Sequence, residues 1–188
     1  MLSERGFTGL IPIDELADEL VDRISTFRCA SDSLENFLTQ QAAEQHRDHL
    51  SHTSLLFHED FDGLVGYITL TNDAIGMQMS EVGELGLKYS IDLAFYPAIK
   101  ICRLAVNDQL QRVGIGGRLL DLAVGEIVAA PSVTAARLLI TDAVNDPAVL
   151  AFYEKHGFSE SYWAAEQARK SRAKSVRATI KMIRDIYA

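Results

Sequence analysis

A short loop with two glycines, set between an apolar segment and a long apolar helical segment, is the strongest constraint in this sequence. Residues 99–106 are predicted to form a buried strand, and residues 114–129 a helix packed on much of its surface. Between them lies Gln111-Arg112-Val113-Gly114-Ile115-Gly116. Glycines at 114 and 116 let the backbone approach a ligand closely and adopt positive φ. The first helix amides lack internal partners, so with the helix dipole they form an anion site, to which Arg112 adds positive charge.

Taken alone, the same loop pattern is also typical of a tight turn. It is neither the G-x-G-x-x-G of dinucleotide-binding folds nor the lysine-containing loop that binds nucleoside triphosphates. The prediction of an anion site therefore depends on the elements around the loop.

The surrounding elements predict a mixed α/β sheet. Strands are expected at residues 7–13, 53–58, 64–70, 99–106 and 137–142, from Phe158 onward, and at 179–186. Helices are expected at 14–21, after Ser31 or Asp32, at 114–129, at 148–156 behind Asp146-Pro147 with Gly157 as the C-terminal cap, and over 163–174. Residues 72–98 lack a clear period and are expected to form a loop with a short helix. This order predicts a sheet that is antiparallel at its front, with a parallel crossover at its centre.

Length and charge narrow the class of protein. The 188 residues suit one domain, and no apolar run approaches the roughly 20 residues of a membrane span. The N-terminus has no basic-then-apolar signal pattern, so a cytoplasmic location is expected by default. The net charge is −8, but residues 166–188 carry +5 and the remainder −13. An acidic body disfavours general nucleic-acid binding, although the basic C-terminal segment could dock RNA or simply balance the acids.

Cysteines and histidines predict no metal site. Cys29 and Cys102 lie far apart in no metal-ligand spacing and are expected to be reduced, apolar side chains. His46, His49 and His52 recur at every third residue, which is not a zinc-ligand pattern. They are expected to be solvated residues on a helix.

Two motifs in this chain resemble those of the GNAT N-acetyltransferase superfamily. Arg103-Leu104-Ala105-Val106, followed by the glycine loop, looks like the family's acetyl-CoA motif, Q/R-x-x-G-x-G/A. Residues 142–158, which contain Asn145, Phe152-Tyr153 and Gly157-Phe158, look like its second signature. The resemblance implies a GNAT fold: one mixed sheet of six or seven strands with splayed central parallel strands, flanked by helices. It also implies a single domain over residues 1–188, whose basic segment 166–188 ends in a strand.

The resemblance further implies a site for acetyl-CoA as acyl donor. Pantetheine would pair with the backbone of Leu104 and Val106, and the pyrophosphate would meet the amides of residues 112–117. Asn145 would contact the pantetheine arm. The full set of cofactor-binding residues expected from the motifs is Leu104, Ala105, Val106, Gln111, Arg112, Val113, Gly114, Ile115, Gly116, Gly117, Arg118, Asn145, Phe152 and Tyr153.

Acyl transfer from a thioester to an amine needs a neutral amine, a donor for the oxyanion and a proton for the departing thiolate. Tyr153 is expected to supply that proton as general acid, and the Val106 amide to stabilise the oxyanion. The alternative is that Tyr153 is only a core tyrosine of an amphipathic helix. The base is not identified; Glu81, Glu84, Asp92 and His52 are the candidates, each equally interpretable as a surface residue.

One branch of the superfamily is especially similar. Phe27-Arg28-Cys29-Ala30-Ser31-Asp32-Ser33-Leu34-Glu35-Asn36-Phe37-Leu38 looks like the opening of acetyltransferase toxins from toxin–antitoxin pairs, as do Gly66-Tyr67 and Arg103 to Val106. Ala30 replaces the usual glycine, and Asn36 stands near the usual aspartate. The branch implies aminoacyl-tRNA as acceptor and an antitoxin partner. The alternatives are a small-molecule or peptide amine, or a non-catalytic CoA-binding sensor or scaffold. A homodimer is compatible with each of these.

Overall fold

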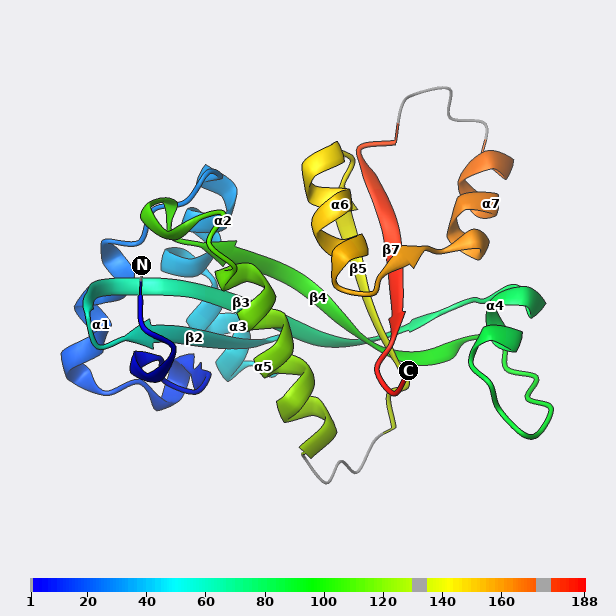
Figure 1. Ribbon diagram of the computed structural model, residues 1–188, viewed down its shortest axis with the longest axis horizontal. Helices are drawn as coiled ribbons and strands as arrows, with labels where there is room; N and C mark the ends of the chain where they lie inside the picture. Colours follow the sequence, from blue (N-terminus) through cyan, green and yellow to red (C-terminus); the bar gives the residue numbers. More distant parts are fainter. Residues whose placement is uncertain (1, 130–134, 172–176) are drawn as a thin grey trace. The chain divides into compact units, whose positions relative to one another are not determined.

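The computed structural model describes residues 2–129, 135–171 and 177–188 (Figure 1). The described residues fall into two compact units. The first is drawn from residues 1–71 and 102–131, and the second from residues 72–101 and 132–188. None of the described helices is long and apolar enough to cross a membrane.

The described strands form one seven-stranded mixed sheet in the order β1-β2-β3-β4-β5-β7-β6. The strands are β1 Ile11–Pro12, β2 His52–His58, β3 Phe61–Ile75, β4 Tyr96–Val106, β5 Leu138–Val144, β6 Ser159–Glu160 and β7 Thr179–Asp185. β4 and β5 are parallel, whereas β1 with β2, β2 with β3, β5 with β7 and β6 with β7 are antiparallel. The predicted mixed sheet with a central parallel pair is confirmed.

Helices occur in the connections between these strands. They are α1 Asp18–Ser25, α2 Asp32–Gln40, α3 Ala42–Arg47, α4 Met79–Glu84, α5 Ile115–Ala129, α6 Pro147–Lys155 and α7 Tyr162–Lys170, with short 3₁₀ turns η1 Glu4–Gly6, η2 Ile13–Glu15 and η3 Asp108–Leu110. The glycine-loop helix and the Asp146-Pro147 helix are confirmed. Helix α7 ends at Lys170, and the last part of its predicted range lies outside the described residues.

The predicted N-terminal strand and helix are wrong in their bounds. Instead of a strand over 7–13, Phe7 makes an isolated bridge to His58, and β1 is only Ile11–Pro12. Proline has no N–H for the ladder, so Pro12 ends this edge strand. A 3₁₀ turn then precedes α1, which begins at Asp18 rather than at residue 14.

The segment that resembles the toxin opening forms the core of the first unit. Phe27, Cys29, Phe37 and Leu38 are all buried in one cluster together with Tyr67 of β3. The Tyr67 hydroxyl donates to the Leu34 carbonyl at 2.8 Å. The similar residues are therefore those that pack α2 onto the sheet.

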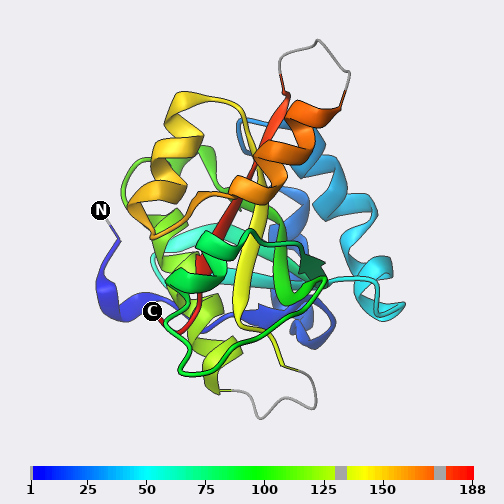
Figure 2. The same cartoon turned by 90° about the vertical axis from the view of Figure 1, so that its right-hand side faces the viewer.

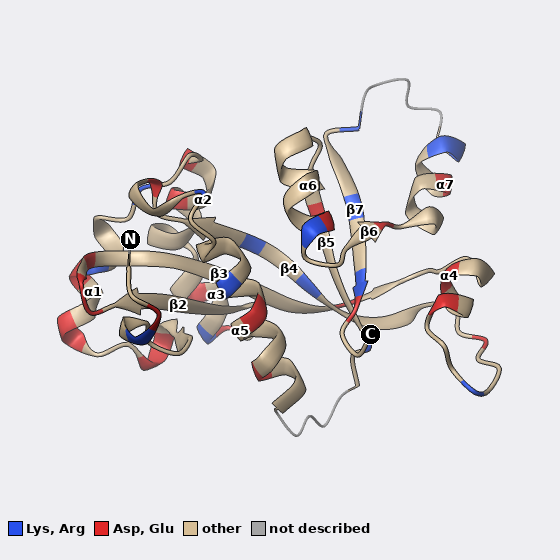
Figure 3. Cartoon of the chain, viewed as in Figure 1, with Lys and Arg blue, Asp and Glu red and all other residues tan. Residues whose placement is uncertain are grey.

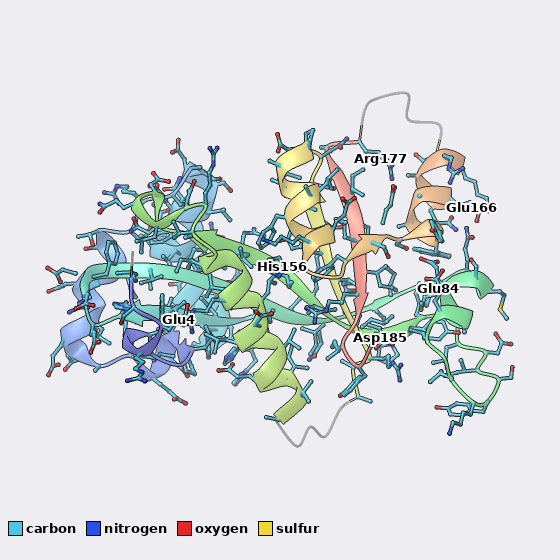
Figure 4. All side chains as sticks on the ribbon, in the orientation of Figure 1. Glu4, Glu84, His156, Glu166, Arg177 and Asp185 are labelled. Carbon is cyan, nitrogen blue, oxygen red and sulfur yellow. The ribbon has the colours of Figure 1, made fainter. Side chains whose placement is uncertain are left out.

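A partly buried ion pair links three segments of the second unit. Arg137 donates from Nε and Nη2 to the two carboxylate oxygens of Asp185, at 2.9 and 2.7 Å. Its Nη2 also donates to the Leu85 carbonyl at 3.0 Å. The Arg137 guanidinium thus joins the start of β5 to the end of β7 and to the segment after α4. Asp185 is labelled in Figure 4. In the same unit, Glu81 of α4 accepts from the first amides of α7, and Figure 2 shows the two helices beside each other.

Gly66 in β3 permits a close approach that any side chain would block. A Cβ there would lie 2.6 Å from the Ala105 carbonyl oxygen and 3.0 Å from Leu119 Cδ1. Gly125 in α5 provides the opposite case, because a Cβ there would meet nothing within 4 Å.

We expect Gly66→Ala to lower the free energy of unfolding by about 1–3 kcal/mol, since backbone of β4 must move to admit the methyl group. Gly125→Ala is expected to raise it by about 0.5–1 kcal/mol, because alanine loses less conformational entropy in a helix. Urea unfolding of both variants measures the two effects. A neutral Gly66→Ala variant would contradict the close approach of β3 and β4.

Candidate active site

The glycine loop runs between η3 and α5 and is exposed from Gln111 to Gly114. Positive φ occurs at Arg112, at 62°, and at Gly114, at 96°. Gly116 has no positive φ, because it already lies in the first turn of α5. The expectation of positive φ is therefore correct for Gly114, wrong for Gly116, and missed Arg112. The Arg118 amide donates to the Gly114 carbonyl at 3.1 Å, which closes the first helical turn.

The loop is anchored by Asn107, a residue that sequence analysis did not single out. Its backbone N–H donates to the Val65 carbonyl at 2.9 Å, and its side-chain amide donates to the Leu64 carbonyl at 3.2 Å. Its Oδ1 accepts from the Gln109 amide at 3.1 Å. An asparagine directly after a strand is a good N-cap, and that was the available signal. Asn107 fixes the start of the loop to β3.

Arg118, expected at the cofactor, is engaged by the N-terminal segment of the same unit. Its guanidinium pairs with the Glu4 carboxylate, labelled in Figure 4. It also lies 4.2 Å from the centroid of the Phe7 ring. These contacts place the Arg118 charge beside η1.

The parallel ladder between β4 and β5 stops before either strand ends. Its register runs from Ala98 with Leu138 to Ile101 with Thr141. β4 nevertheless continues to Val106, and β5 to Val144. Leu104, Ala105 and Val106, the residues expected to meet pantetheine, thus lie past the last pair of the ladder.

Tyr153 is positioned by a strongly defined helix start. The Asp146 side chain accepts from the amides of Ala148 and Val149 at 2.8 and 3.3 Å, with Pro147 as the first helical residue. Gly157 has φ 80°, as its predicted role of C-terminal cap requires. Between these ends, α6 presents Tyr153 toward β5.

The Tyr153 side chain is buried, with 7% of its surface exposed. Its ring packs edge-on against Phe158 at 5.3 Å and Phe152 at 5.1 Å between centroids. Burial raises the pKa of Tyr153 above its usual value, and a hydrogen bond with the Thr141 side chain offsets part of that rise. The phenol is therefore protonated at neutral pH, as a general acid must be.

Asn145, expected at the pantetheine arm, uses its side chain within the second unit. Its Nδ2 donates to the Arg177 carbonyl at 2.8 Å, and its backbone N–H donates to the Ala178 carbonyl at 2.9 Å. Arg177, labelled in Figure 4, lies just before β7. Asn145 thus ties the end of β5 to the start of β7.

Of the candidate bases, Glu81 is structural and not a surface residue. It is 5% exposed, and its carboxylate accepts from the backbone amides of Gln78, Tyr162 and Trp163 at 2.7, 2.9 and 3.1 Å. It caps both α4 and α7. Glu84, Asp92 and His52 are exposed, and Figure 4 shows Glu84 at the end of α4. Partial burial and nearby His46 lower the pKa of His52.

The expectation of solvated helix residues is wrong for the histidine series: His46 is buried, His49 follows the end of α3, and His52 begins β2. The His46 Nδ1 accepts from the Thr53 amide at 3.1 Å, and its Nε2 lies 3.0 Å from Asp14 Oδ1. These contacts fasten α3 to β2 and η2. Within the described part of the chain, no group of three or more His, Cys, Asp or Glu side chains could hold a metal ion. Neither cysteine forms a disulfide.

A charged cluster that sequence analysis missed lies next to Thr141. The Asp142 carboxylate pairs with Lys100 Nζ at 2.6 Å and with Lys181 Nζ at 3.1 Å. Partial burial raises the pKa of Asp142, but the hydrogen bonds from the two lysines outweigh it and hold the pKa below its usual range. Asp142 therefore stays ionised with both oxygens engaged, which disfavours it as a base.

Three of the basic side chains described in the C-terminal segment are paired with acids. Lys170 pairs with Glu166 at 2.8 Å and Arg177 with Glu160 at 2.7 Å, in addition to Lys181 with Asp142. Figure 3 shows these basic residues along β7 and at the end of α7. Arg172 and Lys174 of the predicted basic segment lie outside the described residues.

Comparison with known proteins places the chain in a family. A family model described as an acetyltransferase (GNAT) domain matches residues 51–160, more than half of the chain. The chain therefore belongs to the GNAT acetyltransferase family, and the expected fold and acetyl-CoA-dependent enzyme class are confirmed. A search of curated protein sequences found no match.

Several solved structures share the fold over nearly the whole chain. A tyrosine-to-phenylalanine mutant of KacT matches with TM-score 0.72 at 20% identity, covering 97% of this chain and 96% of that one. AtaT complexed with acetyl-methionyl-tRNAfMet matches with TM-score 0.67 at 20% identity, covering 93% of each chain. AtaTR bound with acetyl-CoA matches with TM-score 0.64 at 20% identity, covering 94% of this chain and 92% of that one.

The left-handed backbone conformation of Arg112 can be tested through its effect on stability. Arg112→Gly is expected to raise the free energy of unfolding by about 1 kcal/mol, because glycine lacks the Cβ clash that costs other residues roughly 1–2 kcal/mol there. Arg112→Ala removes the same guanidinium but keeps a Cβ, so its stability should stay within about 0.5 kcal/mol of the parent. Urea unfolding separates the two. Equal stability of the glycine and alanine variants would show that residue 112 is not held at positive φ in solution.

Proposed function

We propose that this chain transfers an acetyl group from acetyl-CoA to a primary amine, with Tyr153 as general acid. The observation that carries the proposal is the burial of Tyr153 on α6, which packs against β5, the strand whose parallel ladder with β4 ends at Thr141. A buried phenol at the end of a parallel ladder suits the reacting end of an extended ligand that borrows hydrogen bonds from a strand edge.

The glycine loop fits the pyrophosphate end of acetyl-CoA. The exposed loop brings the Arg112 charge and the first amides of α5 to one place, and those amides lack partners within the helix. A Cβ at Gly114 would meet no atom within 4 Å, so space for a ligand is open there. We assign the amides of residues 112–117 to the pyrophosphate, and the backbone of Leu104 and Val106 to the pantetheine arm.

The chemistry assigned to the protein is proton transfer and charge stabilisation. Bound acetyl-CoA supplies the thioester that the amine attacks. The Val106 amide stabilises the oxyanion of the tetrahedral intermediate. As the carbon–sulfur bond breaks, Tyr153 donates its proton to the sulfur, and the amine loses its extra proton to water. Because burial raises the pKa of Tyr153, the proton is present throughout the physiological range.

Tyr153→Phe removes one oxygen and keeps the packed ring. A positioned acid contributes on the order of 10²–10⁴ in rate, so kcat should fall by about that factor. Affinity for acetyl-CoA should stay within a few-fold, because the hydroxyl acts mainly in the transition state. Steady-state kinetics and a calorimetric titration with acetyl-CoA measure both. If kcat is unchanged while chemistry is rate-limiting, Tyr153 is not the general acid. If acetyl-CoA binding is lost while kcat is intact, Tyr153 has a structural role in the binding site.

For the acceptor, we favour the amino group of aminoacyl-tRNA. The support is the match to AtaT, which was solved with acetyl-methionyl-tRNAfMet and covers 93% of this chain. AtaT is also described as a toxin bound to its antitoxin AtaR, so an antitoxin partner belongs to the same proposal. The second candidate is a small-molecule or peptide amine, because three of the described basic side chains of the C-terminal segment, Lys170, Arg177 and Lys181, are paired with acids. A free basic face would bind phosphates more strongly.

An acceptor comparison separates these candidates. Purified protein is incubated with acetyl-CoA and either total aminoacyl-tRNA or a mixture of amino-acid amides, and the released CoA thiol is measured. We expect turnover with aminoacyl-tRNA, none with uncharged tRNA, and loss of turnover in Tyr153→Phe. Faster turnover of the amides would support the free-amine acceptor. Binding of acetyl-CoA without turnover of either would support a sensor or scaffold.

A further inference from the structure

The antiparallel pair β5–β7 of the second unit has one covered face and one open face. Side chains alternate between the two faces along each strand. The side chains of the covered face are all buried: Thr141, Ala143, Ile180 and Met182. On the other face, Val144 and Thr179 form a register pair, and both are exposed. At the end of β5 this open face is therefore accessible to solvent, and to a ligand.

Three charged side chains lie on the open face, directly beyond its apolar part. The apolar part belongs to one cluster, to which β4, β5 and β7 contribute Ala98, Leu138, Ile140 and Ile183. The next residues on this face are Lys100 of β4, Asp142 of β5 and Lys181 of β7. Figure 3 shows basic positions on β4 and β7, the two neighbours of β5. The Lys100–Asp142–Lys181 cluster thus spans three adjacent strands at the level where the parallel ladder ends.

This cluster differs from the other ion pairs of the C-terminal segment by an excess of positive charge. The other two are one-to-one pairs: Lys170 with Glu166, and Arg177 with Glu160. Lys100 and Lys181 instead share the one carboxylate of Asp142, at 2.6 and 3.1 Å. Two ammonium groups and one carboxylate leave a charge of +1, and the two like charges repel each other. An anion bound from the open face would offset that repulsion.

A phosphate suits this arrangement better than other anions. A lysine ammonium is a compact point charge with three donors, and it is a common phosphate ligand. A phosphate group has several oxygens, so it can accept from both ammonium groups at once. The side chains of Lys100 and Lys181 are 28% and 26% exposed, so their charges are screened less than fully solvated ones.

The position of the cluster along β4 favours a phosphate of the acceptor over one of acetyl-CoA. Lys100 precedes Val106 by about 20 Å of strand, at roughly 3.3 Å per residue. The glycine loop, to which the pyrophosphate is assigned, follows still later in the chain. The cluster instead lies at the level where the ladder ends and where the thioester is expected. A molecule that brings an amine to the thioester reaches this level as well.

We propose that Lys100 and Lys181, bridged by Asp142, bind the acceptor phosphate nearest to the reacting amine. In aminoacyl-tRNA the aminoacyl group is esterified to the 3′-terminal adenosine, and the 5′-phosphate of that nucleotide is the nearest one. The inference rests on aminoacyl-tRNA as the acceptor of the proposed function. It names the part of that acceptor which the second unit binds.

The first test measures the KM for aminoacyl-tRNA in Lys100→Gln and Lys181→Gln. Each change leaves the cluster without net charge, so we expect the KM to rise about tenfold. Lys170→Gln is the matched control, because it removes the same charge from a one-to-one pair of the C-terminal segment. Its KM should stay within about twofold of the parent. An equal rise in the control, or no rise in the two cluster variants, would overturn the proposal.

The second test identifies the phosphate. An amino-acid ester of adenosine and the same ester of adenosine 5′-monophosphate differ by one phosphate, and both are measured as competitors of aminoacyl-tRNA. For the parent we expect the phosphorylated ester to have an inhibition constant about tenfold lower. In Lys100→Gln and Lys181→Gln this ratio should fall to about twofold or less, whereas Lys170→Gln should keep it. Equal inhibition of the parent by both esters would contradict the assignment.

Two further outcomes separate this inference from its alternatives. If the cluster variants raise the KM for acetyl-CoA and not that for aminoacyl-tRNA, the bound phosphate is the cofactor's, and the proposal is wrong. If the parent turns over amino-acid amides but not aminoacyl-tRNA, the proposed acceptor fails together with this inference. Turnover of aminoacyl-tRNA with parent-like KM in both cluster variants overturns the anion site alone. Urea unfolding of each variant confirms that the kinetics are those of folded protein.

Discussion

The end of the parallel ladder between β4 and β5 is the constraint on which the proposed chemistry depends. A parallel pair needs each strand to satisfy its neighbour's amides and carbonyls. At Ile101 and Thr141 that pairing stops, and the side chain of Thr141 completes the hydrogen bonding of the last carbonyl. Beyond this point β4 and β5 no longer pair with each other, and a pantetheine arm carries amides able to pair with a strand edge. The reacting end of the ligand is thus expected where the strands stop pairing.

The parts of the fold that local chemistry determines could be predicted from the sequence. Asp146 and Pro147 define the start of α6 by capping and by the fixed φ of proline, and both act within a few residues. The same holds for α5, whose length and apolar content leave no other element possible. The prediction of the first strand was too long because Pro12 limits β1 to a short edge strand. Its hydrogen-bond partners are in β2, far along the sequence.

Within the candidate site, the sequence singles out only the residues that belong to a motif. The glycine loop and Tyr153 have a local signature, but Asn107, Thr141 and Asp142 act through partners that lie dozens of residues away. Glu81 and His46 show that burial of a polar side chain is equally hard to predict from local sequence. Each has a sequence context typical of the surface, yet each is buried and accepts from backbone amides: Glu81 from Tyr162 and Trp163, far along the chain, and His46 from Thr53 in the next element. Propensity and spacing do not encode such contacts, so burial of a polar side chain cannot be inferred from them.

The segment that resembles acetyltransferase toxins does not by itself determine the acceptor. Phe27, Cys29 and Phe37 are buried, and Glu35 accepts from the Cys29 amide at 2.7 Å, so the likeness there is one of core packing. Residues that select an acceptor must be exposed enough to touch it. The segment between α4 and β4 meets that condition, since Tyr89, Leu93 and Phe95 are 67%, 44% and 57% exposed. Large exposed apolar side chains in one segment are typical of recognition surfaces. Acceptor choice is therefore more directly addressed by exchanging these residues than by altering the motif at residues 27–38.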